Sequence, residues 1–257
     1  AALVLAVATV SRTCAARGDG MAFLGLTALV VQPDVVWQEW DVAISAALEE
    51  RGFEVTYGPP LSDVGALSQY ELVALNIRRH LREAEAGALQ SYVSQGGALY
   101  ASWGGPMGAP ELMRDVFRAK DPRSIYITHM TLLESPISAG IGERELALAE
   151  HVGHQRMAPR GWEIVAMDPL GGGVPVAKAP AGEVLGVLSQ CGAGRAAVLG
   201  FGAEQEKYLA RPELGPRMLD NLLTWLLQGR AERGPWHWSE RVTVSLPARA
   251  QITGVEV

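Results

Sequence analysis

Apolar and polar residues follow one another along the first hundred residues in the pattern of strands that alternate with helices. Residues 26–31 are continuously apolar, which is typical of a strand buried on both faces of a sheet. Residues 37–51 then repeat apolar side chains at the spacing of one helix face. The same reasoning predicts strands at 53–57, 71–76 and 98–101, and a second helix at 82–95. This alternation indicates a mostly parallel sheet with helices on both faces.

The second half of the chain is less regular. Residues 121–200 contain short β-prone runs separated by proline and glycine. Residues 183–189 and 195–201 flank a turn that contains glycine, and they predict a hairpin. Residues 214–227 repeat apolar side chains at helical spacing. We therefore predict an α/β fold: a flavodoxin-like three-layer sandwich with a mostly parallel sheet and an added β-rich segment.

The two ends of the chain differ in character from residues 26–229, which we expect to form one domain. Residues 1–25 begin with an apolar run that is shorter than the roughly 20 residues of a membrane-spanning helix. They are a remnant of a signal or anchor, upstream sequence joined to a start at Met21, or an extra strand. Residues 230–257 are β-prone, and they either pack on the domain or begin a further module. The chain is accordingly cytoplasmic or exported.

Composition narrows the classes of partner. The chain has 257 residues, of which 48% are hydrophobic and 19% charged, as in a globular protein with a large core. The net charge is −6 and no run of lysine and arginine stands out, so we expect no nucleic-acid partner. The cysteines are Cys14 and Cys191, too few for a zinc site built from cysteines.

Basic residues follow the strand predicted at 71–76. Asn76 ends that strand, and Arg78, Arg79 and His80 come directly after it. Ligands of open α/β sheets bind at the carboxyl ends of strands, and arginine holds carboxylate or phosphate with paired hydrogen bonds. The alternative is a solvated basic loop that pairs with nearby acidic residues.

We predict no metal and no cofactor. His129, His151 and His154 are the candidate metal ligands, but no carboxylate stands at a suitable spacing from them. The glycines at 171–173 do not lie between a strand and a helix, as a phosphate-binding loop would.

Several stretches together resemble the class I glutamine amidotransferase-like superfamily. Residues 70–97 are similar to its strand, loop and helix before the nucleophile elbow, 100–105 to the elbow G-x-C-x-G, and 194–204 to its closing strand and H-P-E turn. Residues 129–141 resemble a stretch of its trehalose-utilisation-like and β-galactosidase-associated branch. The likeness covers roughly residues 26–229 and implies the sandwich predicted above.

The resemblance also implies that the catalytic groups are missing. Position by position, the superfamily's cysteine falls on Trp103 and its histidine on Gly202, and only Glu204 is retained. An indole is no nucleophile and glycine is no base, so glutamine hydrolysis is not expected. A slip of one residue would place Ser102 at the elbow, but no base follows in the expected place. Trp103 either stacks on a ligand or plugs the vacated site.

We therefore expect a non-catalytic domain more than an enzyme. It would bind a small polar or anionic molecule, or a partner, at a cleft formed by Asn76, Arg78, Arg79, His80, Ser102, Trp103, Gly104, Gly202 and Glu204. Two alternatives remain. The first is a hydrolase that uses Glu204, with Ser102 as the other weak catalytic candidate. The second is an assembly module of a larger protein, joined to neighbouring domains or to further copies of itself. The residues that follow the last predicted strand, Glu204, Glu206 and Lys207, either form one wall of a polar pocket or belong to a surface loop. We favour the surface loop.

Overall fold

The computed structural model describes residues 23, 25–31, 43–58, 61, 63–75, 80–103, 106, 109–149, 161–204 and 209–228. The predicted terminal segments at 1–25 and 230–257 lie outside these residues, apart from Phe23 and Gly25, as does Cys14. In the described part of the chain, no helix is long and apolar enough to cross a membrane.

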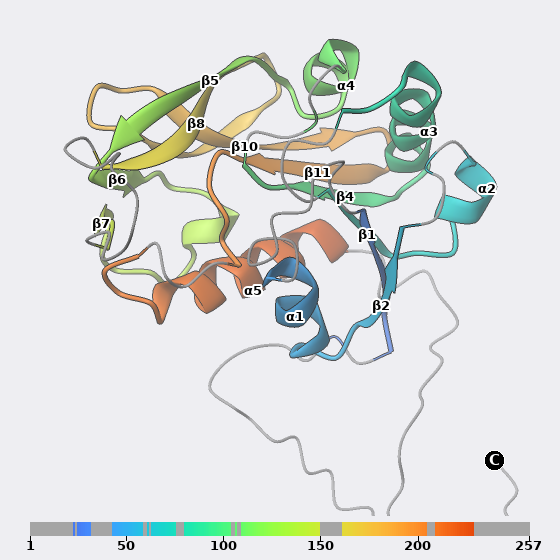
Figure 1. Cartoon of the computed structure of the whole chain (residues 1–257), viewed down its shortest axis with the longest axis horizontal. Helices are drawn as coiled ribbons and strands as arrows, with labels where there is room; N and C mark the ends of the chain where they lie inside the picture. The colour runs from blue at the N-terminus through green and yellow to red at the C-terminus, as the bar shows by residue number, and fades with distance from the viewer. Residues whose placement is uncertain are drawn as a thin grey trace, which may run out of the picture.

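A parallel sheet forms the centre of the molecule (Figure 1). Its strands lie in the order β2 (Glu54–Tyr57), β1 (Thr27–Val31), β3 (Leu72–Leu75), β4 (Ala98–Ala101) and β11 (Gly194–Leu199). All residues of β3 and β4 are buried, which explains their unbroken apolar sequences. The fold class predicted from the sequence is confirmed.

The ends of the central strands are level with one another. Ala101 at the end of β4 pairs with Leu75, the last residue of β3, on one side. On the other side it pairs with Val198, which is one residue from the end of β11. The segments that follow these strands therefore start from the same edge of the sheet, which is the usual ligand-binding edge of an α/β fold.

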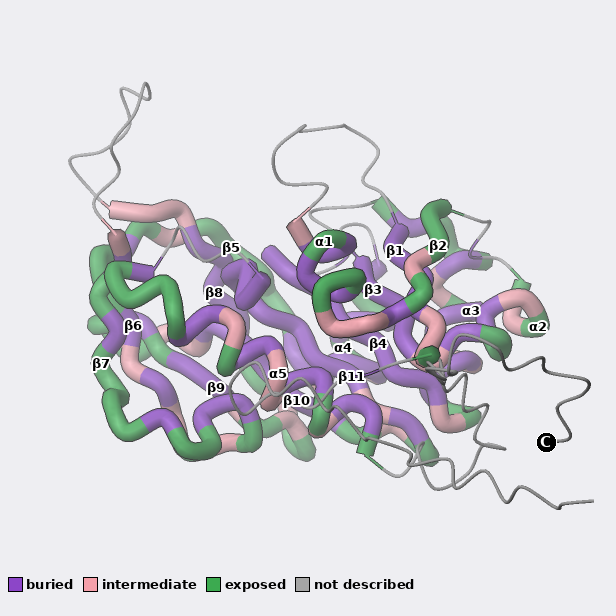
Figure 2. The backbone as a smooth tube through the Cα atoms, turned by 90° about the horizontal axis from the view of Figure 1, so that it is seen from below, coloured by how far each residue is buried: buried purple, intermediate pink, exposed green. Residues whose placement is uncertain are grey.

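Helices cover both faces of this sheet (Figure 1). On one face lie α1 (Ala43–Glu49) and α5 (Leu214–Leu227), and on the other α2 (Val64–Leu67), α3 (Glu83–Ser94) and α4 (Pro110–Asp115). Side chains that alternate along β4 separate into two apolar clusters accordingly. We call them the α1/α5 core, which includes Ile44, Leu48, Tyr100, Trp103, Leu219 and Leu222, and the α3 core, which includes Leu89, Tyr92, Leu99 and Phe117. Figure 2 shows the buried strands between the more exposed loops.

An antiparallel extension continues the sheet beyond β11. The hairpin predicted there is confirmed as β10 (Val184–Cys191) paired with β11, and Cys191 is its partly buried last residue before the turn. The extension goes on through β9 (Val174–Lys178), β6 (His129–Leu132) and β7 (Glu145–Ala147), and the strands β5 (Ala119–Ile127) and β8 (Trp162–Pro169) pair beside it.

Short elements were not predicted from the sequence. The helices α2 and α4, the 3-10 turn η1 (Pro136–Ser138) and the strands β6 and β7 are each too short to show a period. Local contacts fix them instead: the Asp63 carboxylate accepts a hydrogen bond from the Gly65 N–H at the start of α2 (2.9 Å). The helix predicted at 37–51 is described from Ala43 onward.

Candidate functional site

The turn after β4 holds an unusual backbone conformation at Trp103. Its φ is +56°, in the left-handed region that L-residues avoid at a cost of about 1–2 kcal/mol. A nucleophile elbow places such a residue directly after a buried strand, so that its side chain leaves the turn sharply. The backbone ahead of Trp103 is held to the sheet, because the Ser102 N–H donates to the carbonyl of Leu75 (3.3 Å). The elbow-type position predicted from the sequence is therefore occupied by a tryptophan in a strained conformation.

The indole of Trp103 is packed inside the protein. Only 7% of the residue is exposed, and its neighbours belong to the α1/α5 core. Ser102 is also buried, at 1% exposure. Whether Trp103 stacks on a ligand or plugs the vacated site was left open from the sequence, and a buried indole is what a plug would require.

The turn after β11 approaches the elbow from the neighbouring strand. Gly200 is required there, because a Cβ atom on it would lie 1.7 Å from the carbonyl oxygen of Val165 in β8. That close approach also lets the Val165 N–H donate to the Gly200 carbonyl (2.9 Å). The backbone leaving β11 is thereby fixed, and it carries Gly202 and Glu204 into buried positions.

Glu204 is buried, which corrects the surface-loop interpretation favoured from the sequence. It is 8% exposed, and its Oε2 accepts a hydrogen bond from the Tyr100 hydroxyl at 2.7 Å. Glu206 and Lys207, which were considered with it, lie outside the described residues. The sequence pattern suggested a loop because polar residues follow the strand, but the fold turns the first of them inward.

Burial controls the protonation of this pair. It raises the pKa of Glu204, and the residue's own backbone N–H, the Tyr100 hydroxyl and the Ser102 hydroxyl only partly oppose the shift. The pKa of Tyr100 is raised well above its usual value, first by burial and then by the charge of Glu204. Tyr100 thus remains a hydrogen-bond donor to Glu204.

Some polar atoms of this cluster have no regular hydrogen bond within the described part of the chain. These atoms are the Ser102 Oγ and the Glu204 Oε1. The Ser102 hydroxyl is near enough to influence the pKa of Glu204, but the geometry of their approach is not that of a hydrogen bond. A buried polar atom without a partner costs about 1–3 kcal/mol, so natural proteins keep such atoms mainly where they serve a purpose.

A cavity of about 290 Å³ lies next to Glu204, between α1 and α5. Ala46 and Ala47 of α1 and Leu219 of α5 contribute to its apolar wall. Arg51 and Glu204 are among its polar residues. The short alanine side chains leave the two helices apart at this place.

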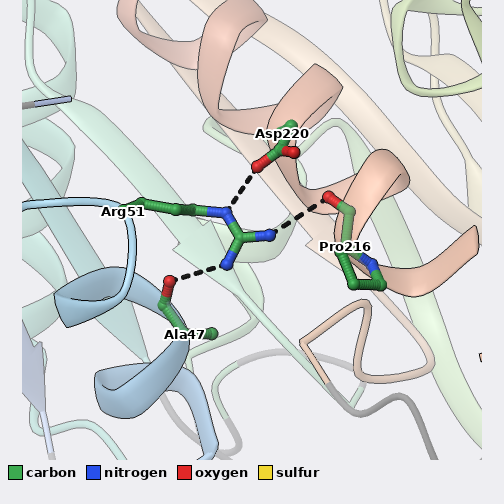
Figure 3. A network of polar contacts seen from close by, with 4 residues as sticks. All are labelled: Ala47, Arg51, Pro216 and Asp220. Atoms are coloured by element: carbon green, nitrogen blue, oxygen red, sulfur yellow. Dashed lines mark hydrogen bonds and ion pairs between the residues drawn. The ribbon is translucent and has the colours of Figure 1, made fainter. Parts of the chain in front are cut away.

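Arg51 ties the two helices together beside the cavity (Figure 3). Its Nε donates to the Asp220 carboxylate at 2.5 Å, and its Nη2 donates to the Pro216 carbonyl at 3.2 Å, both on α5. Its Nη1 donates to the Ala47 carbonyl of α1 at 2.7 Å. The guanidinium is therefore a fixed part of the cavity wall, and its charge is neutralised by Asp220.

The structure brings part of the predicted site together. Ser102, Trp103, Gly202 and Glu204 meet at the carboxyl ends of β4 and β11. His80 is described as an exposed residue. The other predicted site residues, Asn76, Arg78, Arg79 and Gly104, lie outside the described residues.

The described residues contain no cluster of metal-ligating side chains. His129 is exposed on β6, and His151 and His154 lie outside the described part of the chain. Sequence reasoning missed Tyr100 as a member of the site. The signal was a tyrosine inside a fully buried strand, because its hydroxyl must find a partner there.

Several solved structures share this fold. A proposed GMP synthase subunit from Thermoplasma acidophilum aligns with a TM-score of 0.54 and 16% identity, over 80% of this chain and 96% of that one. A ThuA-like protein from Bacteroides uniformis aligns with a TM-score of 0.55 and 11% identity, over 78% and 91%. The cold-adapted β-galactosidase from Rahnella sp. R3 aligns with a TM-score of 0.56 and 12% identity. The alignment covers 79% of this chain but only 31% of the β-galactosidase chain.

These similarities show that the chain shares its α/β fold with the amidotransferase-like and ThuA-like proteins among these structures. The identities are too low to carry an activity from one protein to another. No protein-family model and no curated protein sequence matches the chain. The resemblance noted in the sequence is thus confirmed at the level of fold, and the function must be argued from the site itself.

Proposed function

We propose that this chain is a non-catalytic amidotransferase-like domain that binds a small polar molecule or a partner at its altered site. The observation that carries the proposal is Trp103, which stands in the strained elbow position with its indole buried. The superfamily mechanism implied by the resemblance needs a thiolate at that position and a base beside it. An indole supplies no nucleophile, and Gly202 supplies no base.

The surviving carboxylate also favours this proposal. A glutamate that orients a catalytic base must be ionised and must face that base. Glu204 instead accepts a hydrogen bond from Tyr100, and burial raises its pKa. Its present surroundings suit a structural or ligand-holding carboxyl group better than a catalytic one.

The proposal is tested by measuring glutamate release from glutamine with the full chain. We expect no release above the buffer, and no covalent adduct when the protein is incubated with an electrophilic glutamine analogue and examined by intact-mass spectrometry. Release by the wild type that is abolished in both Trp103→Ala and Glu204→Gln would show that the site is catalytic and would refute the proposal. A matched Phe117→Ala variant, whose side chain lies in the α3 core, controls for general loss of structure.

One observation favours a second candidate, a hydrolase of another substrate class. The Ser102 hydroxyl influences the pKa of Glu204, so a serine and a carboxylate lie together beneath Trp103. Such an enzyme would need the indole to move, because Ser102 is buried. A fluorophosphonate probe that labels Ser102 in the wild type would support this candidate. Labelling of the Trp103→Gly variant alone would mean that Trp103 keeps the serine closed off in the wild type, which argues against this second candidate.

A further inference from the structure

The cavity between α1 and α5 is a separate space from the region that Trp103 fills, since the indole does not contribute to its wall. Its volume of about 290 Å³ is at the lower end of the range for small-molecule pockets, about 300–1,000 Å³. Its wall combines small apolar residues, such as three alanines of α1 and Leu219 of α5, with polar atoms that make up the larger part of its surface. Such a wall suits a small molecule that carries both carbon and polar groups.

The polar groups of the cavity are few and are held in place. Glu204 belongs to the wall, it is more than nine-tenths buried, and its Oε1 has no hydrogen-bond partner within the described residues. Its Oε2 is engaged by Tyr100, and the Ser102 hydroxyl and the residue's own backbone N–H also act on the carboxyl group, so Oε1 is the oxygen that we assign to a ligand. Oε1 lies beneath the cavity surface, so a ligand would reach it only when the carboxyl group turns about its soft terminal torsion, which would also change the hydrogen bond of Oε2 with Tyr100.

We infer that this cavity binds a small uncharged molecule that carries hydroxyl groups, one of which bonds to Glu204. The inference rests on the proposed function, because it assigns Glu204 to holding a ligand and not to assisting a nucleophile. A hydroxyl group suits Oε1 in either protonation state, since it can donate to a carboxylate oxygen or accept from a protonated one.

The charges around the cavity exclude other ligand classes. Glu50 is exposed at the cavity wall and carries a negative charge, and the positive charge of Arg51 is already neutralised by Asp220. A phosphate or carboxylate would therefore meet no free positive charge among the described residues and would be repelled by Glu50. A cation would meet Glu50, a solvated carboxylate that compensates little for lost hydration, and Glu204, whose pKa is raised by burial.

The test measures binding of defined probes to the full chain by saturation-transfer difference NMR. D-Ribose, D-glucose and glycerol represent hydroxylated molecules, inorganic phosphate and L-glutamate represent anions, and ethanolamine represents cations. We expect at least one of the hydroxylated probes to bind in the millimolar range and the charged probes not to compete with it.

A cavity-filling variant locates the binding. Ala46 lines the cavity but is exposed, so Ala46→Phe enlarges the side chain without entering either core. We expect it to weaken binding at least about tenfold, which corresponds to about 1.4 kcal/mol. Ala84→Phe is the matched control, because Ala84 is an exposed alanine of α3 on the opposite face of the sheet. Ala43→Leu, which also lines the cavity, repeats the test should the first variant not fold.

The outcomes separate this inference from the proposed function. Binding of a hydroxylated probe that is lost in Ala46→Phe and kept in Ala84→Phe supports the inference. No binding, equal binding to both variants, or tighter binding of phosphate at this cavity overturns it, while the absence of glutamine hydrolysis would still stand. Glutamine hydrolysis by the wild type refutes the proposed function whatever the probes show.

Discussion

At the scale of single residues, Trp103 combines an unfavourable backbone conformation with the favourable burial of its side chain. The left-handed backbone costs about 1–2 kcal/mol for any residue with a Cβ, whereas burial of an indole stabilises the fold by more than that. Strain of this kind persists where surrounding structure enforces it, and it is concentrated at functional sites. The surrounding structure here includes β3, because the Ser102 N–H donates to the Leu75 carbonyl and so ties the turn to the sheet.

This balance predicts an inverted order of two substitutions. Trp103→Ala should lower the free energy of unfolding by about 3–5 kcal/mol through the lost packing. Trp103→Gly should be at least as stable as Trp103→Ala, although glycine elsewhere costs about 0.5–1 kcal/mol more than alanine. Urea unfolding of both variants measures the order. Phe117, which is buried and is not among the positive-φ residues, should give the ordinary order, with alanine above glycine.

Glu204 gives the site a pH dependence whose sign follows from its burial. A carboxyl group whose pKa is raised on folding binds more protons in the folded state than in the unfolded state. The wild type should therefore lose stability as pH rises from the ordinary pKa of glutamate through the raised pKa of Glu204. Above that pKa the loss is complete and constant.

Replacement of Glu204 by glutamine should remove this dependence. Glutamine still accepts the hydrogen bond from Tyr100 but does not titrate, so Glu204→Gln should gain stability relative to the wild type as the pH rises through the raised pKa of Glu204. Urea unfolding across this range measures the difference. Glu213→Gln is the control, because the backbone N–H of Glu213 and then Arg211 lower the pKa of that exposed carboxylate, and its effect should have the opposite sign. If the difference in unfolding free energy between Glu204→Gln and the wild type did not change with pH, the raised pKa of Glu204 would be contradicted.

At the scale of elements, sequence reasoning succeeded where burial is continuous and failed where contacts are local. The strands β3 and β4 and the helix α5 were predicted because long apolar or periodic runs identify them. Short helices such as α2 have no period to read. The inward turn of Glu204 was also beyond the sequence, because it depends on the close approach of Gly200 to β8 and on a tyrosine from another strand.

The ion pair that connects α1 to α5 is a further feature that could not be predicted from any local sequence pattern. Arg51 and Asp220 are 169 residues apart, and the arginine side chain is only 13% exposed. A partly buried charged hydrogen bond of this type contributes about 1.5–3 kcal/mol, more than an exposed ion pair. The pair therefore fixes the distance between the helices, and with it the shape of the cavity.

A double-mutant cycle measures this contribution. We expect Arg51→Met and Asp220→Asn to show a coupling energy of about 1–3 kcal/mol in urea unfolding, because each removal leaves a partly buried charge unpaired. Arg123 and Asp168 form the comparison pair at 2.9 Å, with side chains about half exposed at 45% and 46%. Their coupling should stay below about 1 kcal/mol. Equal coupling energies for the two pairs would mean that the Arg51–Asp220 pair stabilises the protein no more than a surface ion pair does.

At the scale of the whole molecule, the fold and the identity of the side chains at the candidate site are separate properties. The parallel sheet, its level strand ends and the two apolar cores are built from residues that the resemblance also covers. Solved structures at 11% to 16% identity share this architecture, which shows how weakly it depends on particular residues. Under the proposed function, the chemistry of the site depends on very few positions, of which Trp103 and Gly202 are two.

The two cores predict that residues 23–228 fold without the segments on either side. The α1/α5 core includes Phe23 at one end of this range and Leu227 at the other, so the range closes both faces of the sheet. A fragment of residues 23–228 should unfold in one transition by calorimetry, with a Tm within about 4 °C of the full chain, or about 1 kcal/mol. A larger fall would show that residues 1–22 or 229–257 pack on the domain, and fragments lacking one end each would identify which. An unchanged Tm would show that neither terminal segment contributes to the stability of the domain.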